Sequence, residues 1–236
     1  MDAYSLAQSG AGARTATRAD FIRRTYLHLA GAILAFLALE YYLLNTPAIT
    51  NPLVKLAFGS RYGWLGLIGG FAVGGWLARS FAANVKSTGA QYFGLALYVV
   101  LEALIFVPLV AIAMHYDKSG TTLKAAGIMT TMLFAGLTGI ALTSKRNFSF
   151  MRSYLVMGGF IALGLIVLSI MIGFTLGIVF SGAMIVLACG AILYDTSRIM
   201  HEFDTSQHVA ASLELFASVA LLLWYVLRLL MALNRR

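Results

Sequence analysis

The chain has little of what a water-soluble or disulfide-stabilised protein contains. Only 11% of its 236 residues are charged, whereas soluble domains carry about 25%. The single cysteine, Cys189, cannot form an intrachain disulfide, and no Cys/His spacing typical of a metal site is present. Three prolines are too few for a proline-rich linker. These absences predict that most of the chain lies outside water.

Signatures of enzymes and of nucleic-acid-binding proteins are also missing. The sequence has no phosphate-binding Gly-rich loop with its Lys, no His-Glu-x-x-His and no serine nucleophile elbow. Its net charge is +8, but the basic residues stand in short clusters between apolar runs and not on one soluble face. We therefore expect no catalytic activity, no cofactor and no nucleic-acid partner. The predicted partner is the lipid bilayer.

What the chain does contain is seven apolar runs, each close to the ~20 residues that a helix needs to cross a bilayer. Helices are predicted because backbone groups in lipid must form their hydrogen bonds within the segment. Strands of a membrane barrel would alternate in polarity, whereas these runs are continuously apolar. The runs span residues 25–44, 63–83, 90–114, 125–143, 154–174, 176–198 and 209–230. The prediction is an all-α membrane protein with seven transmembrane helices.

The segments outside the runs define the domain organisation. Residues 1–24 are expected to form a polar N-terminal tail, exposed and disordered, without the features of a removable signal peptide. Residues 25–232 are expected to form a single transmembrane domain, because the connections are too short for a soluble one. The longest link, residues 45–62, is predicted to be non-helical because it contains Pro47 and Pro52.

Small residues recur along the second apolar run. Gly66, Gly70 and Gly74 stand at every fourth position. Such a ridge lets a neighbouring helix approach closely. The ridge predicts a close helix contact, either inside the bundle or between two copies of the chain.

The distribution of Lys and Arg predicts how the chain is oriented in the membrane. Ten of these residues fall on the side of the N-terminus and seven on the opposite side. The N-terminus is therefore expected to face the cytoplasm. Arg235 and Arg236 conflict with this orientation if all seven runs cross the membrane. A re-entrant last segment is the alternative that would remove the conflict.

Two acids near the ends of apolar runs are the first candidate functional residues. Asp195 and Glu214 each lie within ~10 Å of the same membrane edge, at 1.5 Å per residue. A carboxylate inside a membrane costs about 3 kcal/mol or more unless it has a partner. Facing carboxylates would share a proton near neutrality, and both are weak candidate ligands for Ca²⁺. The alternatives are a helix-end turn at Asp195 and a helix start at Glu214.

Three further charged residues lie within the runs. Arg79 is expected at a depth similar to that of Asp195, where it would act as a gating latch that protonation of the acid loosens. The alternative is that its side chain extends to the lipid headgroups. Glu102 stands near the centre of the third run, which predicts a pore or proton-relay role or else a structural hydrogen bond. Glu40 lies near the outer end of the first run and is expected at the membrane interface.

Three segments resemble the Bax-inhibitor-1 family, closest to its bacterial YccA-like branch. The strongest is GAILYDTSRIMH at residues 190–201, accompanied by RTYL at 24–27 and TSKRNFSF at 143–150. The segments stand in the family's order among seven apolar runs, and the resemblance covers most of the chain. It implies a bundle whose last helix is wrapped by the other six. It also implies a location in the bacterial inner membrane and no enzyme chemistry.

The resemblance also implies a function. Members of the family are described as pH-sensitive calcium leak channels with an aspartate pair on the sixth and seventh helices as sensor. The first aspartate corresponds to Asp195, but Phe216 stands where the second would be. Glu214 is the nearest acid, about 200° away around an ideal helix. Arg79 is similar in place to the family's second-helix arginine latch.

We therefore expect a pH-sensitive calcium or cation leak channel whose gate is the protonation of an intramembrane acid. The alternative is a non-conducting modulator of the membrane protease FtsH, a role associated with the YccA-like branch. In that case the protease would grip the tail at residues 1–20. The oligomeric state is left open.

Overall fold

A computed structural model describes residues 3–60, 62–144 and 146–234, with side chains from Thr17 onward. Over these ranges the chain forms eight helices and no strand. Seven helices are long and apolar enough to cross a membrane, which confirms the predicted helical membrane bundle. The helices are α1 (Ala3–Leu44), α2 (Pro47–Phe58), α3 (Gly63–Ala82), α4 (Thr88–Tyr116), α5 (Thr121–Thr143), α6 (Met151–Ile172), α7 (Ile178–His201) and α8 (His208–Asn234).

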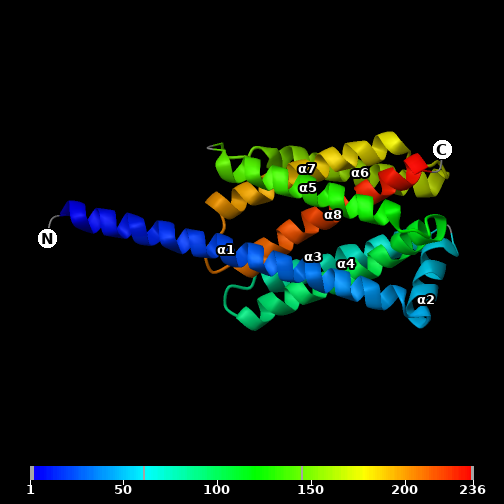
Figure 1. The fold of residues 1–236 in the computed structure, drawn as a ribbon, viewed down its shortest axis with the longest axis horizontal. Helices are drawn as coiled ribbons and strands as arrows, with labels where there is room; N and C mark the ends of the chain where they lie inside the picture. The colour runs from blue at the N-terminus through cyan, green and yellow to red at the C-terminus, as the bar shows by residue number, and fades with distance from the viewer. Residues whose placement is uncertain (1–2, 61, 145, 235–236) are drawn as a thin grey trace.

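The bundle is elongated, and α1 protrudes from one end of it (Figure 1). This end is called the N-terminal end below, and the end where α8 finishes is called the opposite end. Helix α8 is continuous over 27 residues, about 40 Å at 1.5 Å per residue. The structure therefore does not adopt the alternative of a re-entrant last segment. Arg61, Lys145, Arg235 and Arg236, which entered the orientation argument, lie outside the described residues.

The prediction of a non-helical link between the first two spans is wrong. Residues 47–58 form α2, with Pro47 in its first turn and Pro52 inside it. A proline in the first turn loses no hydrogen bond, since the first N–H groups of a helix have no partner within it. Helix α2 packs against α1, α3 and α4 at the opposite end of the bundle (Figure 1).

The segment expected to be a disordered tail differs as well. Residues 3–24 are the first turns of α1, while Met1 and Asp2 lie outside the described residues. The segment has no proline, and Asp20 forms ion pairs with Arg23 at 3.0 Å and with Arg24 at 2.7 Å. Such pairs three and four residues apart favour a helix. Arg18 joins this helix to the rest of the molecule by donating to the backbone carbonyl of Phe203 at 2.7 Å.

Helix α8 forms the centre of the core, as the resemblance implied. It packs against α1, α3, α4, α5 and α7, and Figure 1 shows it running between the surrounding helices. Its fully buried side chains include Leu213, Leu215, Leu222, Val226 and Leu227. Because α8 is buried on several sides, polar groups on it must find partners on neighbouring helices.

A short turn at the opposite end ties α4, α5 and α8 together. Asp117 accepts hydrogen bonds from Ser119 and from both the backbone N and the hydroxyl of Thr122, at 2.7 and 2.8 Å. These bonds hold the pKa of the Asp117 carboxyl below its usual range. Asn234 near the end of α8 donates to the Thr122 hydroxyl at 2.9 Å. The Asp117 carboxylate thus binds the first turn of α5, and Thr122 in that turn binds the end of α8.

The predicted glycine ridge makes a close contact at one of its three members. A Cβ atom at Gly74 would lie 2.7 Å from a methyl group of Leu101, whereas Cβ atoms at Gly66 and Gly70 would meet nothing within 4 Å. The closest approach of α3 to α4 occurs instead at Gly94. A Cβ atom there would lie 2.4 Å from the carbonyl oxygen of Ala78 and 2.5 Å from the Ala82 nitrogen. The small residue that this contact requires is therefore on α4.

Replacing Gly94 with Ala should destabilise the bundle by about 1–3 kcal/mol, because the added methyl group meets backbone atoms that cannot rotate away. Gly70→Ala is the matched control, since the added methyl group enters open space and favours the helix by up to about 1 kcal/mol. Unfolding followed by circular dichroism in detergent measures both variants. Equal unfolding temperatures for Gly94→Ala and the parent would contradict the close contact.

Candidate functional site

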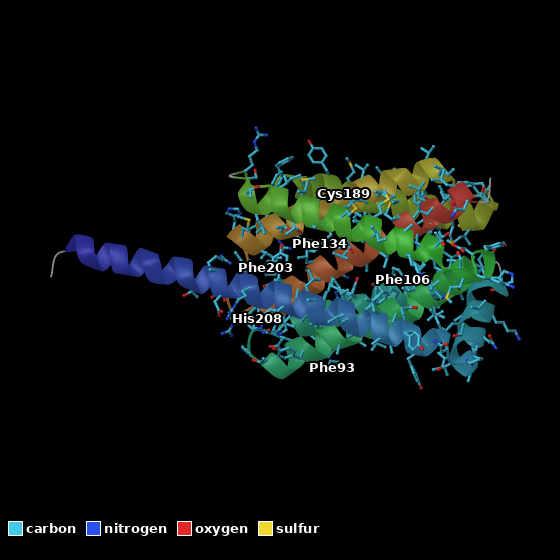
Figure 2. All side chains as sticks on the ribbon, in the orientation of Figure 1. Phe93, Phe106, Phe134, Cys189, Phe203 and His208 are labelled. Carbon is cyan, nitrogen blue, oxygen red and sulfur yellow. The ribbon has the colours of Figure 1, made fainter. Side chains whose placement is uncertain are left out.

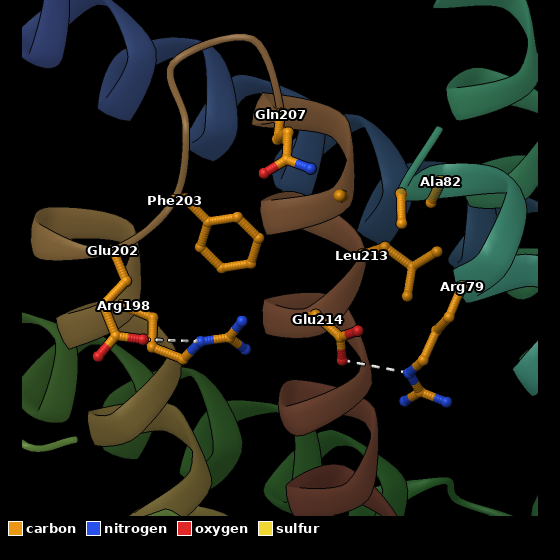
Figure 3. Close-up of a pocket in the computed structure, with 10 residues that line it drawn as sticks. Arg79, Ala82, Arg198, Glu202, Phe203, Gln207, Leu213 and Glu214 are labelled. Carbon is orange, nitrogen blue, oxygen red and sulfur yellow. Dashed lines mark hydrogen bonds and ion pairs between the residues drawn. The ribbon is translucent and has the colours of Figure 1, made fainter. Parts of the chain in front are cut away.

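A cavity of about 350 Å³ opens between α3, α7 and α8 at the N-terminal end of the bundle. Two arginines and two glutamates line it, and they form two ion pairs on different walls (Figure 3). Arg79 with Glu214 stands on the α3 and α8 side, and Arg198 with Glu202 stands on the α7 side. Charged side chains are rare in this apolar chain, and four of them line one cavity. We therefore take this cavity as the candidate site.

The Arg79–Glu214 pair connects α3 to α8. Arg79 Nε lies 3.1 Å from Glu214 Oε2, and Arg79 Nη2 donates to the Tyr98 hydroxyl of α4 at 3.3 Å. The guanidinium also stands over the Tyr98 ring, 4.9 Å from its centroid, which adds a cation–π attraction. Arg79 therefore faces the bundle and not the lipid headgroups. Its acidic partner is Glu214, whereas the sequence suggested Asp195.

The second pair holds the end of α7. Arg198 lies 3.4 Å from Glu202, and its guanidinium stands over the Phe203 ring at 4.6 Å. Glu202 also accepts a hydrogen bond from Ser149 in the connection between α5 and α6. The same connection meets α7 at Ser197, whose hydroxyl accepts from the backbone N of Phe148 at 3.0 Å. Two segments that carry the family resemblance, 143–150 and 190–201, are therefore in direct contact.

Asp195 lies about one turn along α7 from Arg198 and is not among the residues that line the cavity. Its side chain is only 7% exposed and accepts a hydrogen bond of 2.5 Å from the Ser218 hydroxyl of α8. The partner is a side chain of another helix, and not the local backbone of a helix-end turn. A charge-assisted bond of this kind is stronger than one between neutral groups.

Asp195 and Glu214 are near each other but form no hydrogen bond with one another in the described part of the chain. The register of α7 against α8 places Ser218 opposite Asp195, so Glu214 lies one turn nearer the N-terminal end. Each acid has its own donor, which is Ser218 for Asp195 and Arg79 for Glu214. Matching depths, estimated from each helix separately, did not reveal this one-turn offset.

The position where the resemblance placed a second acid belongs to the core. Phe216 is 2% exposed, and its ring contacts those of Phe36 and Tyr98 at centroid distances of 6.0 and 6.2 Å. Tyr98 in turn carries the Arg79 guanidinium. The position expected from the family to hold the second aspartate is therefore filled by the apolar ring of Phe216.

Two more acids are buried along the bundle. Glu102 on α4 is 6% exposed, and its Oε2 atom has no hydrogen-bond partner among the described residues. Glu40 on α1 is also 6% exposed, with neither carboxylate oxygen bonded within that same part of the chain. Protein therefore covers the Glu40 side chain, and its expected depth at the membrane interface stays a prediction. Helix α2, which the sequence did not predict, packs against α1 and α4 at that end of the bundle.

The structure does not assemble a dedicated metal centre from the residues that it describes. No group of three or more His, Cys, Asp or Glu side chains there stands close enough to hold an ion. Asp195 and Glu214 lie in the same region, but each is engaged with another side chain. The weak Ca²⁺ site predicted at these two acids stays a prediction.

Seven apolar helices, one of them central, with ion pairs and buried acids between them, define a multi-pass helical membrane protein. The family described as "Inhibitor of apoptosis-promoting Bax1" matches residues 18–236. The chain therefore belongs to this Bax inhibitor-1 family.

Similar proteins come from a virus, an animal and a bacterium. The "Golgi anti-apoptotic protein" of Vaccinia virus (strain Lister) is 27% identical over 245 residues, which cover 100% of this chain and 94% of the relative. "Protein lifeguard 4" of Mus musculus is 27% identical over 252 residues, with the same coverage. An uncharacterized protein of Pseudomonas aeruginosa is 26% identical over 200 residues, 84% of this chain and 82% of the relative. The similarity to each of these relatives thus covers most of both sequences.

Replacing Ser218 with Ala should lower the free energy of unfolding by about 1–3 kcal/mol, because the buried Asp195 carboxylate loses its donor. Ser80→Ala is the matched control. The Ser80 hydroxyl is exposed and bonds to the carbonyl of Trp76 in its own helix, so its loss should change stability by less than about 0.5 kcal/mol. Unfolding in detergent compares the two variants. Equal stabilities would show that the Asp195–Ser218 bond does not hold α7 to α8.

Proposed function

We propose that this protein is a cation leak channel, with Ca²⁺ as the transported ion and protonation of Asp195 as the gate. The observation that carries the proposal is the buried Asp195 carboxylate and its hydrogen bond to Ser218 on the central helix. A buried carboxylate bonded across two helices is the kind of group whose protonation changes how those helices pack. The family resemblance supports the same activity.

Acids at successive depths support a route for cations through the bundle. Asp195 stands six residues from the end of α7 and Glu102 fourteen residues into α4. These positions are about 9 and 21 Å from the helix ends that lie at the N-terminal end of the bundle. Glu40 lies four residues before the end of α1, close to the opposite end. Carboxylate oxygens are the ligands that Ca²⁺ prefers, so such a series suits a transported cation.

The contacts of the site suit a closed state. The Arg79 guanidinium is bonded to Glu214 at the cavity, so this carboxylate is not free to bind an entering cation. The Asp195–Ser218 bond holds α7 against α8. Protonation of Asp195 replaces a charge-assisted hydrogen bond with a weaker neutral one. We expect α7 and α8 to separate more readily in that state and the leak to increase as the pH falls.

The proposal includes an orientation and a location. With the N-terminal end of the bundle in the cytoplasm, the cavity and Asp195 would respond to cytoplasmic pH. The excess of basic residues on that side supports this orientation. The resemblance to the YccA-like branch supports the bacterial inner membrane.

In liposomes the parent protein should release Ca²⁺ faster at pH 6 than at pH 8, while Asp195→Asn should leak at both values with little dependence on pH. Asparagine resembles the protonated acid, since it is neutral and of similar shape. A calcium-sensitive dye inside the liposomes measures the flux.

Asp204→Asn is the matched control for this experiment. Asp204 is an exposed loop acid that accepts hydrogen bonds from Ser206, so its neutralisation should leave the pH profile of the parent unchanged. Absence of flux above that of protein-free liposomes would contradict the channel. Retention of the parental pH profile in Asp195→Asn would contradict the gate.

A second candidate function is supported by the shape of α1. Helix α1 extends beyond the bundle (Figure 1), and Arg18 ties it to the connection between α7 and α8. A protruding helix offers a partner a segment to hold without unfolding the bundle. A non-conducting modulator of the membrane protease FtsH is the candidate that uses this segment.

Deleting residues 1–16 separates the two candidates, because Arg18 and the whole bundle are retained. The modulator predicts that the truncated chain no longer co-purifies with FtsH and that its turnover in cells changes. In that case both full-length and truncated chains stay at background in the liposome assay. The channel predicts flux from both chains. Unchanged co-purification and turnover would count against the modulator.

A further inference from the structure

A second cavity lies on the outside of the bundle, between α1 and α4, and it is apolar. Its volume is about 830 Å³, and it is lined on the α1 side by small residues that include Gly31, Ala35 and Ala38. Val99 and Val100 belong to its α4 wall. Both helices are membrane spans, so this α1–α4 groove faces the bilayer. A groove of this size is large enough for a small-molecule ligand.

One end of the groove is polar. His28 and Tyr92 line it there and are joined by a hydrogen bond of 2.8 Å between His28 Nε2 and the Tyr92 hydroxyl. His28 Nδ1 lies 2.7 Å from the backbone oxygen of Arg24. Because a carbonyl oxygen can only accept, Nδ1 carries the proton, and in the neutral ring Nε2 accepts from Tyr92. The polar end is therefore held in one arrangement.

A histidine of α8 and two arginines of α1 lie near this polar end. The His208 ring lies 4.8 Å from the His28 ring, and Figure 2 shows His208 at the N-terminal end of the bundle, beside α1. Arg24 and Arg23 are more than half exposed and share one acid, Asp20, between them. An excess of positive charge therefore meets the membrane surface where the groove opens, and it favours a negatively charged headgroup.

The groove is elongated along α1. The lining residues run along this helix from Leu27 to Tyr42, which is about 22 Å at 1.5 Å per residue. An acyl chain of a membrane lipid also extends along the spanning direction, so the length and the apolar lining of the groove suit a hydrocarbon chain.

We propose that the α1–α4 groove binds a phospholipid, with an acyl chain against Gly31 and Ala35 and the phosphate against Arg24, His28 and Tyr92. The lipid belongs to the leaflet at the N-terminal end of the bundle. The apolar walls match the acyl chain, and the basic mouth matches the phosphate. This site is separate from the ion-pair cavity and does not depend on conduction.

Gly31→Leu tests the acyl-chain site because the glycine offers space without a clash. A Cβ atom at Gly31 meets nothing within 4 Å, so the leucine side chain enters the groove and leaves the helix packing unchanged. Gly159→Leu is the matched control. Gly159 is an exposed glycine of α6, and a Cβ atom there also meets nothing within 4 Å.

The probe is phosphatidylglycerol with a photoactivatable diazirine in its acyl chain, mixed into phosphatidylcholine nanodiscs that hold the full-length protein. Labelled peptides are located by mass spectrometry. Label is expected on α1 and α4 in the parent and in Gly159→Leu, and it should fall roughly tenfold in Gly31→Leu. Arg24→Gln should lower labelling by a few-fold, while Arg152→Gln, which changes an exposed arginine of α6, should not.

Several outcomes would overturn the proposal. One is equal labelling of α1 and α4 in the parent and Gly31→Leu, and another is label spread evenly over all seven spans. Efficient disulfide cross-linking of two copies through Ala35→Cys, in a Cys189→Ser background, would assign the groove to a second copy. Should Gly31→Leu fail to give a folded protein by circular dichroism, Ala38→Leu fills the same groove from a position two turns further along α1.

Discussion

One hydrogen bond between two buried side chains fixes how α7 meets α8. Asp195 is almost fully buried, and its donor is Ser218 on the central helix. The contact sets the register of the two helices. It also places Glu214 one turn nearer the N-terminal end, where it forms an ion pair with Arg79 of α3. One buried acid therefore determines where the charged cavity forms and which helices line it.

The contacts around the cavity join parts of the chain that are far apart in sequence. Arg79 reaches Glu214 and Tyr98, so α3, α4 and α8 meet at one guanidinium. Just after the end of α7, the backbone carbonyl of Phe203 accepts a hydrogen bond from Arg18 of α1. Glu202 accepts one from Ser149, which lies in the connection between α5 and α6. Side chains of the site thus contact several helices directly. The protonation gate proposed above would act through these contacts.

The number and type of the spanning helices followed from apolar run length, because a membrane leaves few alternatives to helices of about 20 residues. The short helix α2 was missed because Pro47 and Pro52 indicated a break. Proline nevertheless fits a first turn, and packing against α1, α3 and α4 supports the rest of α2. Residues 3–24 were expected to be a tail because they are polar. The segment contains no proline, and α1 continues through it.

The composition of the chain identified the membrane, the helices and the unusual acids, because the cost of placing charge in lipid depends on residue type and position along the chain. Asp195, Glu214, Glu102 and Arg79 were all found in this way. Their partners were not, because a partner depends on the rotation and register of each helix against its neighbours. Packing among helices distant in sequence decides these partners. It places Ser218 opposite Asp195, pairs Arg79 with Glu214 and leaves the groove beside Gly31. Apolar run length carries no information about that packing.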